Sequence, residues 1–155
     1  MKYMYGNLIT LAEKGYFDVI IHGCNCFHKM GAGIAKEIAD RYPIAYEEDK
    51  KTNYGSPLKL GSYMYVNVES PIIKNHHFFI VNAYTQYYYG RGKNKQDLIH
   101  HYIQEVFEEI AYEFFGYRIG YPKIGAGLAG GDWEKISQII DYELGSIDHK
   151  LVILN

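Results

Sequence analysis

Hydrophobic positions along the chain follow two periods, which together predict alternating strands and helices. Asp18–His22 is an apolar run typical of an interior strand, whereas the apolar stripe from Leu98 to Phe114 has helical spacing. The pattern predicts strands at 2–5, 18–22, 61–68, 77–84, 118–122 and 150–154, and helices at 8–14, 34–39, 98–114 and 133–144. Pro71 lies between the third and fourth strands, which are therefore expected to form an antiparallel hairpin. Residues 44–60 form a polar connection, in which the charged run Glu47–Lys51 is expected to face solvent. The order predicts an α/β fold with a mixed sheet of about six strands and helices on both faces.

Two glycine-rich turns stand between a predicted strand and a predicted helix. The first is Gly31-Ala32-Gly33, and the second is Gly125-Ala126-Gly127-Leu128-Ala129-Gly130-Gly131. Glycine tolerates positive φ and has no Cβ, so the backbone can approach a ligand closely, and free N–H groups at a helix start attract anions. Two such loops on one small sheet predict a single ligand that carries phosphates. Glycines in two unrelated tight turns are the simpler alternative, which the shared strand-to-helix context disfavours.

Composition places the chain among globular proteins. It has 155 residues, of which 48% are hydrophobic and 22% charged, and no Pro/Ser-rich linker divides it. One domain over residues 1–155 is therefore expected. The formal net charge of −2 provides no basic field, so nucleic acid is not an expected partner. The 17 tyrosines are unusual, and many should lie half-exposed on strands or near the site.

The cysteines indicate a reducing compartment. Cys24 and Cys26 are too close in sequence for ordinary disulfide geometry, and the chain offers no other partner. Residues 1–5 lack the apolar core of a signal peptide, and no run is long enough to span a bilayer. A cytoplasmic protein without membrane association is therefore expected. The Cys24-x-Cys26-x-His28 spacing does not match structural zinc, so neither a metal nor a cofactor is expected.

The residues around both glycine turns resemble the ligand loops of macrodomains, a superfamily that binds ADP-ribose. The resemblance rests on Ile-His-Gly-Cys-Asn-Cys…Met-Gly-Ala-Gly-Ile-Ala at 21–35 and on Pro-Lys-Ile-Gly-Ala-Gly-Leu-Ala-Gly-Gly-Asp-Trp at 122–133. Within the superfamily, the segments are most similar to the branch of ADP-ribose-1″-phosphate phosphatases of the yeast and phage type. That branch also holds terminal ADP-ribose protein glycohydrolases and antitoxin macrodomains that remove ADP-ribose from DNA. The order of elements fits this fold, a three-layer α/β/α sandwich, across nearly the whole chain.

The resemblance implies how ADP-ribose would bind. Asn7 and Leu8 stand where the family has Asp-Ile beside the adenine, and an amide oxygen can accept from the adenine amino group less strongly than a carboxylate. A helix N-cap is the alternative for Asn7. Asn25 matches the asparagine that contacts the distal ribose, with capping of its own loop as the alternative. Backbone N–H groups would hold the phosphates at Gly31, Ala32, Gly33, Ile34, Gly125, Ala126, Gly127, Leu128, Ala129 and Gly130.

The same resemblance suggests His22 and Asp132 as catalytic partners of Asn25. The phosphatase branch also carries a histidine where His22 ends its strand, and an imidazole there could transfer a proton. The alternative is a satisfied histidine, half-buried at a strand end. Asp132 could orient a water molecule, and it is equally what a helix N-cap looks like.

Two departures argue against the glycohydrolase mechanism. Ala129 stands where that branch carries its catalytic aspartate, directly after Gly-Leu. The loop that offers Lys93 and Lys95 follows Thr85-Gln86, which looks like the phosphatase branch, so these lysines and Arg91 would neutralise a phosphate. The sequence therefore favours a monomeric ADP-ribose-1″-phosphate phosphatase that takes ADP-ribose or its 1″-phosphate as a small-molecule ligand. The alternatives are an ADP-ribosyl hydrolase that acts on protein or nucleic acid, and a noncatalytic ADP-ribose reader.

Overall fold

Six strands form a single sheet in the order β1-β6-β5-β2-β4-β3. The computed structural model describes residues 1–155. Its strands are β1 (Lys2–Tyr5), β2 (Val19–Cys24), β3 (Tyr63–Glu69), β4 (His77–Tyr84), β5 (Ile119–Tyr121) and β6 (His149–Ile153). Neighbouring strands are parallel except β3 and β4, which are antiparallel with Val66 opposite Ile80. The predicted hairpin and the mixed sheet are therefore confirmed.

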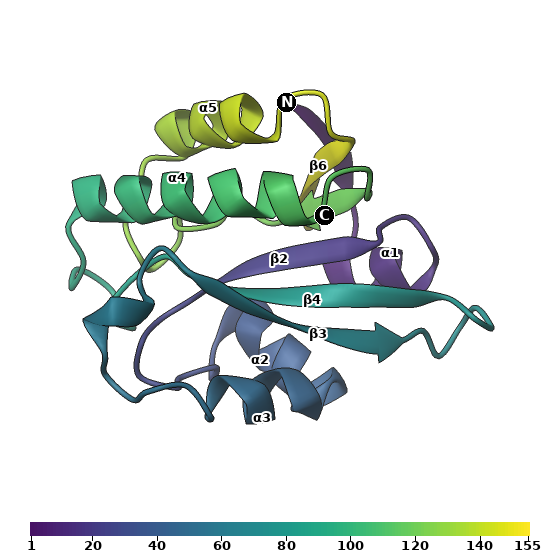
Figure 1. Ribbon diagram of the computed structural model, residues 1–155, viewed down its shortest axis with the longest axis horizontal. Coiled ribbons are helices and arrows are strands. Elements are labelled where there is room, and N and C mark those ends of the chain that lie inside the picture. The colour runs from purple at the N-terminus through teal and green to yellow at the C-terminus, as the bar shows by residue number, and fades with distance from the viewer.

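Helices cover both faces of this sheet (Figure 1). α4 (Gln96–Glu113) and α5 (Trp133–Leu144) lie over one face. The other face carries α1 (Leu8–Glu13), α2 (Gly33–Arg41) and α3 (Pro43–Asp49), and a short 3-10 turn, η1 (Pro57–Lys59), precedes β3. The predicted α/β/α sandwich is thus confirmed. None of these helices combines the length and apolar character needed to cross a membrane.

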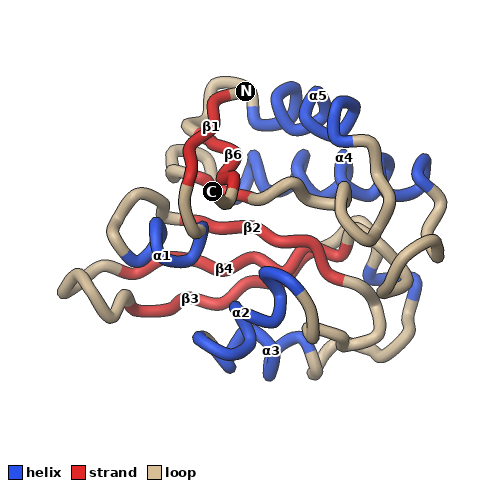
Figure 2. The backbone as a smooth tube through the Cα atoms, turned by 180° about the vertical axis from the view of Figure 1, so that it is seen from behind, coloured by secondary structure: helices blue, strands red, loops and turns tan.

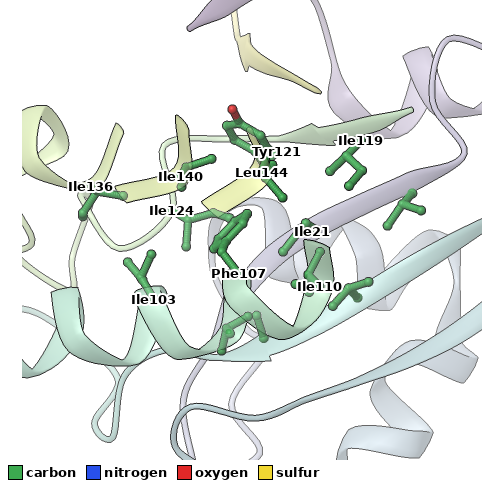
Figure 3. Packing of buried hydrophobic residues seen from close by; sticks show 14 of the residues in the cluster. Ile21, Ile103, Phe107, Ile110, Ile119, Tyr121, Ile124, Ile136, Ile140 and Leu144 are labelled. Atoms are coloured by element: carbon green, nitrogen blue, oxygen red, sulfur yellow. The ribbon is translucent and has the colours of Figure 1, made fainter. Parts of the chain in front are cut away.

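Each face of the sheet has its own hydrophobic core, because strand side chains point alternately to opposite faces. In β2, Val19 and Ile21 pack beneath α4 and α5, whereas Ile20 packs against the helices of the other face. Figure 3 shows the first core, to which α4 contributes Phe107 and α5 contributes Ile140. Both faces of β2 are therefore buried, which accounts for its uninterrupted apolar run and its central place in the sheet.

One helix was not predicted from the sequence. α3 occupies Pro43–Asp49, within the segment that the pattern assigned to a polar connection. Pro43 suits a first helical turn, where its missing N–H needs no partner, and Ala45 is buried against the sheet. The solvated face expected for Glu47–Lys51 is wrong at Asp49, which is completely buried and accepts a hydrogen bond from the Tyr84 hydroxyl at 2.6 Å. The charged residues Glu47, Glu48 and Asp49 fill the second half of α3, so its apolar positions do not recur with a helical period.

Candidate functional site

Loops at the carboxyl ends of the parallel strands form the candidate site. In a parallel sheet these ends share one edge, where a ligand can contact several loops at once. Here the edge brings together residues 6–7 after β1, 25–32 after β2, 85–95 after β4 and 122–132 after β5. Figure 2 shows the loops after β2 and β4 leaving the sheet at the same end. Three cavities are lined by these loops, and two of them include residues of the glycine-rich turns.

The wide cavity, of about 370 Å³, lies between the loops that follow β2, β4 and β5. It is lined by Gly23, Asn25, Lys29, Gly31, Ala32, Ala35, Gln86, Tyr89, Gly90 and Leu128. Four of these positions, Asn25, Gly31, Ala32 and Leu128, were predicted as site residues. Lys29 supplies the cation of this cavity, with its ammonium group 5.8 Å from the centre of the Tyr89 ring.

The narrow cavity, of about 150 Å³, lies between the end of β1, the start of α2 and the C-terminal residues. It is lined by Gly6, Asn7, Leu8, Gly33, Ile34, Glu37, Pro122, Val152 and Leu154. Asn7, Leu8, Gly33 and Ile34 were predicted here. Glu37 was not predicted, and it is the charged group of this cavity.

The N-terminus of α2 lies between the two cavities, with Ala32 lining the wide one and Gly33 the narrow one. Gly33 adopts a φ of 56°, which turns the chain into the helix. No side chain caps α2, and the N–H groups of Gly33, Ile34 and Ala35 donate to no acceptor in the protein. Uncapped N–H groups at the positive end of a helix attract an anion, so this point suits a diphosphate that joins the two cavities.

The second glycine loop is a tight turn held by its own backbone. The N–H of Gly131 donates to the carbonyl of Gly125 at 2.6 Å, and a Cβ on Gly131 would lie only 2.5 Å from that oxygen. The N–H groups of Gly127, Leu128 and Ala129 donate to no protein acceptor and could receive an anion. Of the residues predicted to bind ligand in this loop, only Leu128 reaches a cavity, whereas Gly125, Ala126, Gly127, Ala129 and Gly130 line neither.

Asn25 both lines the wide cavity and braces its own loop. Its Oδ1 accepts from the N–H of Phe27 at 2.9 Å, and its Nδ2 donates to the carbonyl of Lys29 at 2.8 Å. The loop-capping alternative is therefore observed. One Nδ2 proton remains for a ligand hydroxyl, because a side-chain amide carries two.

Asn7 is occupied on both sides of its amide. Its Oδ1 caps α1 by accepting from the N–H of Thr10 at 2.9 Å, so the alternative N-cap is observed. Its Nδ2 donates to Oε1 of Glu37 at 2.8 Å, and Nη1 of Arg41 donates to the same oxygen at 3.1 Å. From the sequence, Glu37 and Arg41 look like an ordinary exposed i, i+4 pair, so no signal connected Glu37 with the loop after β1.

His22 is completely buried on the α2 and α3 side of the sheet and lines neither cavity. Its Nε2 lies 2.6 Å from Oδ1 of Asn82, whose Nδ2 donates to the carbonyl of Ala45 at 2.9 Å. Because Asn82 Oδ1 can only accept, His22 Nε2 carries the proton and donates. Burial lowers the pKa of His22, which favours the neutral ring. The side chain joins β2, β4 and α3, and the structure does not bring it to the wide cavity.

Asp132 also stands apart from both cavities. It is the N-cap of α5, because its Oδ1 accepts from the N–H of Glu134 at 3.0 Å. Its own N–H donates to Nε2 of His100 at 3.0 Å, which ties the second glycine loop to α4. The capping role that the sequence left open is therefore observed, and the carboxylate is not placed beside Asn25.

The lysines expected to neutralise a phosphate face elsewhere. Lys93 and Lys95 line a different cavity, of about 240 Å³, together with Tyr87 and Tyr102. The cation of the wide cavity is therefore Lys29, which lies within the first motif but carried no signal that separated it from any exposed lysine.

The two thiols have no nucleophilic role in this arrangement. Cys24 and Cys26 are free and buried. Burial raises the pKa of Cys26 to about 11 and that of Cys24 well above its ordinary value, so both stay protonated at neutral pH. No group of three or more His, Cys, Asp or Glu side chains converges to hold a metal ion.

The fold and the site define an α/β/α domain with an uncapped helix N-terminus between two cavities. This arrangement suits an elongated anionic ligand. The family model of the Macro domain matches residues 21–140. The chain therefore belongs to the Macro domain family, an ADP-ribose-binding family.

Known proteins of this kind resemble the chain over nearly its whole length. An uncharacterized 17.5 kDa protein of Enterobacteria phage T4, from the tk-vs intergenic region, is 34% identical over 142 residues, which cover 91% of this chain and 88% of that protein. The ADP-ribose 1″-phosphate phosphatase of Saccharomyces cerevisiae is 26% identical and is aligned over 91% of each chain. The structure of Thermosipho africanus DarTG in complex with ADP-ribose has a TM-score of 0.69 at 16% identity, covering 93% of this chain and 39% of that one.

Proposed function

We propose that this protein binds ADP-ribose along the carboxyl edge of its sheet and hydrolyses ADP-ribose-1″-phosphate to ADP-ribose and phosphate. The observation that carries the binding proposal is the position of the α2 N-terminus between the two cavities. The narrow cavity, of about 150 Å³, suits a nucleobase, and the wide one, of about 370 Å³, suits the distal ribose with its phosphate. The free N–H groups of Gly33, Ile34 and Ala35 suit the diphosphate between them.

The phosphatase proposal is supported by the yeast relative of that name and by the chemistry of the wide cavity. Water would attack the phosphorus, the bond from phosphorus to the 1″ oxygen would break, and that oxygen would take up the proton that the attacking water releases. Lys29 would offset charge on the phosphoryl oxygens, and Asn25 would hold a ribose hydroxyl with its remaining Nδ2 proton. His22 and Asp132 have no part in this scheme, because neither lines the cavity.

A noncatalytic ADP-ribose reader is the second candidate, and one observation favours it. Lys29 and Tyr89 are the only ionisable side chains that line the wide cavity, so no carboxylate or imidazole stands ready to activate water. An ADP-ribosyl hydrolase that uses an aspartate after Gly-Leu is disfavoured, because Ala129 supplies no carboxylate there and is buried.

The test measures phosphate release from ADP-ribose-1″-phosphate, with ADP-ribose binding measured by calorimetry on the same sample. We expect release by the wild type and a reduction of roughly tenfold or more in Asn25→Ala and Lys29→Met. Lys93→Met is the matched control, because it removes the same charge from the separate cavity of about 240 Å³. Tight binding without release would reject the phosphatase and leave the reader, whereas no binding would reject both.

A further inference from the structure

We infer that Glu37, rather than Asn7, contacts the nucleobase in the narrow cavity and selects adenine. The inference rests on the proposed function, because that function places the base in this cavity. Its basis is that the amide of Asn7 is held by hydrogen bonds to Thr10 and Glu37, whereas one carboxylate oxygen of Glu37 accepts no hydrogen bond from the protein.

Both ends of the Asn7 amide already hydrogen-bond to the protein, which leaves one Nδ2 proton and one lone pair of Oδ1. Its Oδ1 accepts from the N–H of Thr10 at 2.9 Å, which fixes the orientation of the amide as the cap of α1. Its Nδ2 donates to Glu37 at 2.8 Å. An Asn7 amide turned toward a base would leave a helix N–H without its cap, which costs about 1 kcal/mol.

Glu37 keeps one carboxylate oxygen for a ligand. Its Oε1 accepts from both Asn7 at 2.8 Å and Arg41 at 3.1 Å, whereas its Oε2 accepts no hydrogen bond from the protein. Arg41 is itself ion-paired with the buried Glu13, so the group that orients Glu37 is anchored in turn. The Glu37 side chain is only 39% exposed, and Oε2 is therefore a partly shielded acceptor in a fixed place.

Glu37 is the only residue of the narrow cavity that can offer a charged hydrogen-bonding group to the rim of a base. The other walls of this cavity include the apolar side chains of Leu8, Ile34 and Val152. These walls suit the faces of a flat ring, and the free carboxylate oxygen suits a donor on its rim. The exocyclic amino group of adenine is such a donor.

A comparison with hypoxanthine distinguishes a hydrogen bond from the adenine amino group to Glu37 from binding that depends only on the shape of the cavity. Hypoxanthine presents a carbonyl oxygen where adenine presents the amino group, and a carboxylate facing a carbonyl repels it. A neutral amide could turn and donate to that carbonyl instead. A carboxylate at this point therefore discriminates between the two bases, and an amide does not. A group built to hydrogen-bond a substrate donor rejects an analogue without it, here by roughly tenfold or more because the site is partly exposed.

The experiment compares calorimetric affinities of the whole protein for ADP-ribose and for inosine diphosphate ribose, its hypoxanthine analogue. We expect the wild type to prefer ADP-ribose by roughly tenfold or more and Glu37→Gln to bring the ratio of the two affinities close to one. Asp40→Asn is the matched control, because it removes the same charge from an exposed position of α2 that pairs only with Lys36. The control should keep the wild-type ratio.

Asn7→Asp distinguishes the two candidate contacts by the sign of its effect. If Asn7 read the amino group, a carboxylate there would strengthen ADP-ribose binding. If Glu37 reads it, the substitution removes the donor that orients Glu37 and places two carboxylates in contact, so ADP-ribose should bind several-fold more weakly. Equal wild-type affinities for both nucleotides, or an unchanged ratio in Glu37→Gln, would overturn the role of Glu37 while leaving ADP-ribose binding in place. No binding of either nucleotide would reject the proposed function and this inference with it.

Discussion

Replacing His22 tests whether this residue holds the fold together or transfers a proton. The ring is completely buried and donates to Asn82 at 2.6 Å, so His22→Ala leaves a cavity and an unpaired buried acceptor. These two effects together should lower the free energy of unfolding by about 3 to 5 kcal/mol. His22→Gln keeps an N–H donor in a similar place and should be clearly less destabilising.

The pH dependence of stability isolates the imidazole. Burial holds the pKa of His22 below its ordinary value of 6.5, so the unfolded chain takes up a proton below that pH while the folded chain does not. The stability contribution is therefore complete above pH 6.5 and falls by up to about 1.4 kcal/mol per pH unit below it. His149, whose pKa is also lowered by burial, adds a slope of the same sign, which is present in both proteins and cancels in their comparison.

The assay is urea unfolding followed by the fluorescence of Trp133 between about pH 5 and pH 8, for the wild type and His22→Gln. Below pH 6.5 we expect the slope of the unfolding free energy against pH to be smaller in the variant by up to about 1.4 kcal/mol per pH unit, which corresponds to one proton. Phosphate release per folded molecule should survive in His22→Gln. An unchanged slope, or loss of release at undiminished stability, would refute the structural role.

Three further substitutions test the loops and the core. Gly131→Ala should destabilise the fold by about 1 to 3 kcal/mol and weaken ADP-ribose binding, because its Cβ would meet the Gly125 carbonyl at 2.5 Å. Thermal unfolding measures the stability and calorimetry the binding. Gly127→Ala, whose Cβ meets nothing within 4 Å, is the control for stability alone. Phe107→Ala empties a buried position of α4 beside Tyr121 of β5 and should lower the unfolding free energy in urea by about 3 to 5 kcal/mol, with the ADP-ribose affinity of the folded protein unchanged. Asp132→Ala removes the cap of α5 and should cost about 1 kcal/mol of stability, while phosphate release per folded molecule persists. Release abolished without loss of stability would instead place Asp132 at the reacting atoms.

The elements of secondary structure were largely predictable, because burial in a layered sheet leaves a period in the sequence. The apolar run of β2 and the stripe of α4 are direct consequences of which faces they bury. The prediction failed at α3, where the apolar positions do not recur with a helical period, although the shorter α1 was predicted correctly. α3 contains one buried alanine and a buried Asp49, and its charged letters resemble those of a solvated loop.

The candidate site was predictable where its chemistry lies in the backbone. Gly31 and Gly33 indicate a turn into a helix from the sequence alone. The structure places Gly31 at the wide cavity and Gly33 at the narrow one. Side chains were harder to assign, because their roles depend on direction. His22 and Asn25 are three residues apart, yet one points into the interior and the other lines the wide cavity.

The sequence by itself determined the order of the strands and of every helix except α3, the two glycine loops and the family to which the chain belongs. Only the tertiary structure decided which side chains meet at the carboxyl edge. Glu37 and Asn7 lie on different elements and share a hydrogen bond at 2.8 Å, and Lys29, rather than Lys93 or Lys95, faces the wide cavity. The physical reason is that periodicity reports burial along one element, whereas contacts across elements depend on how the helices are placed on the sheet.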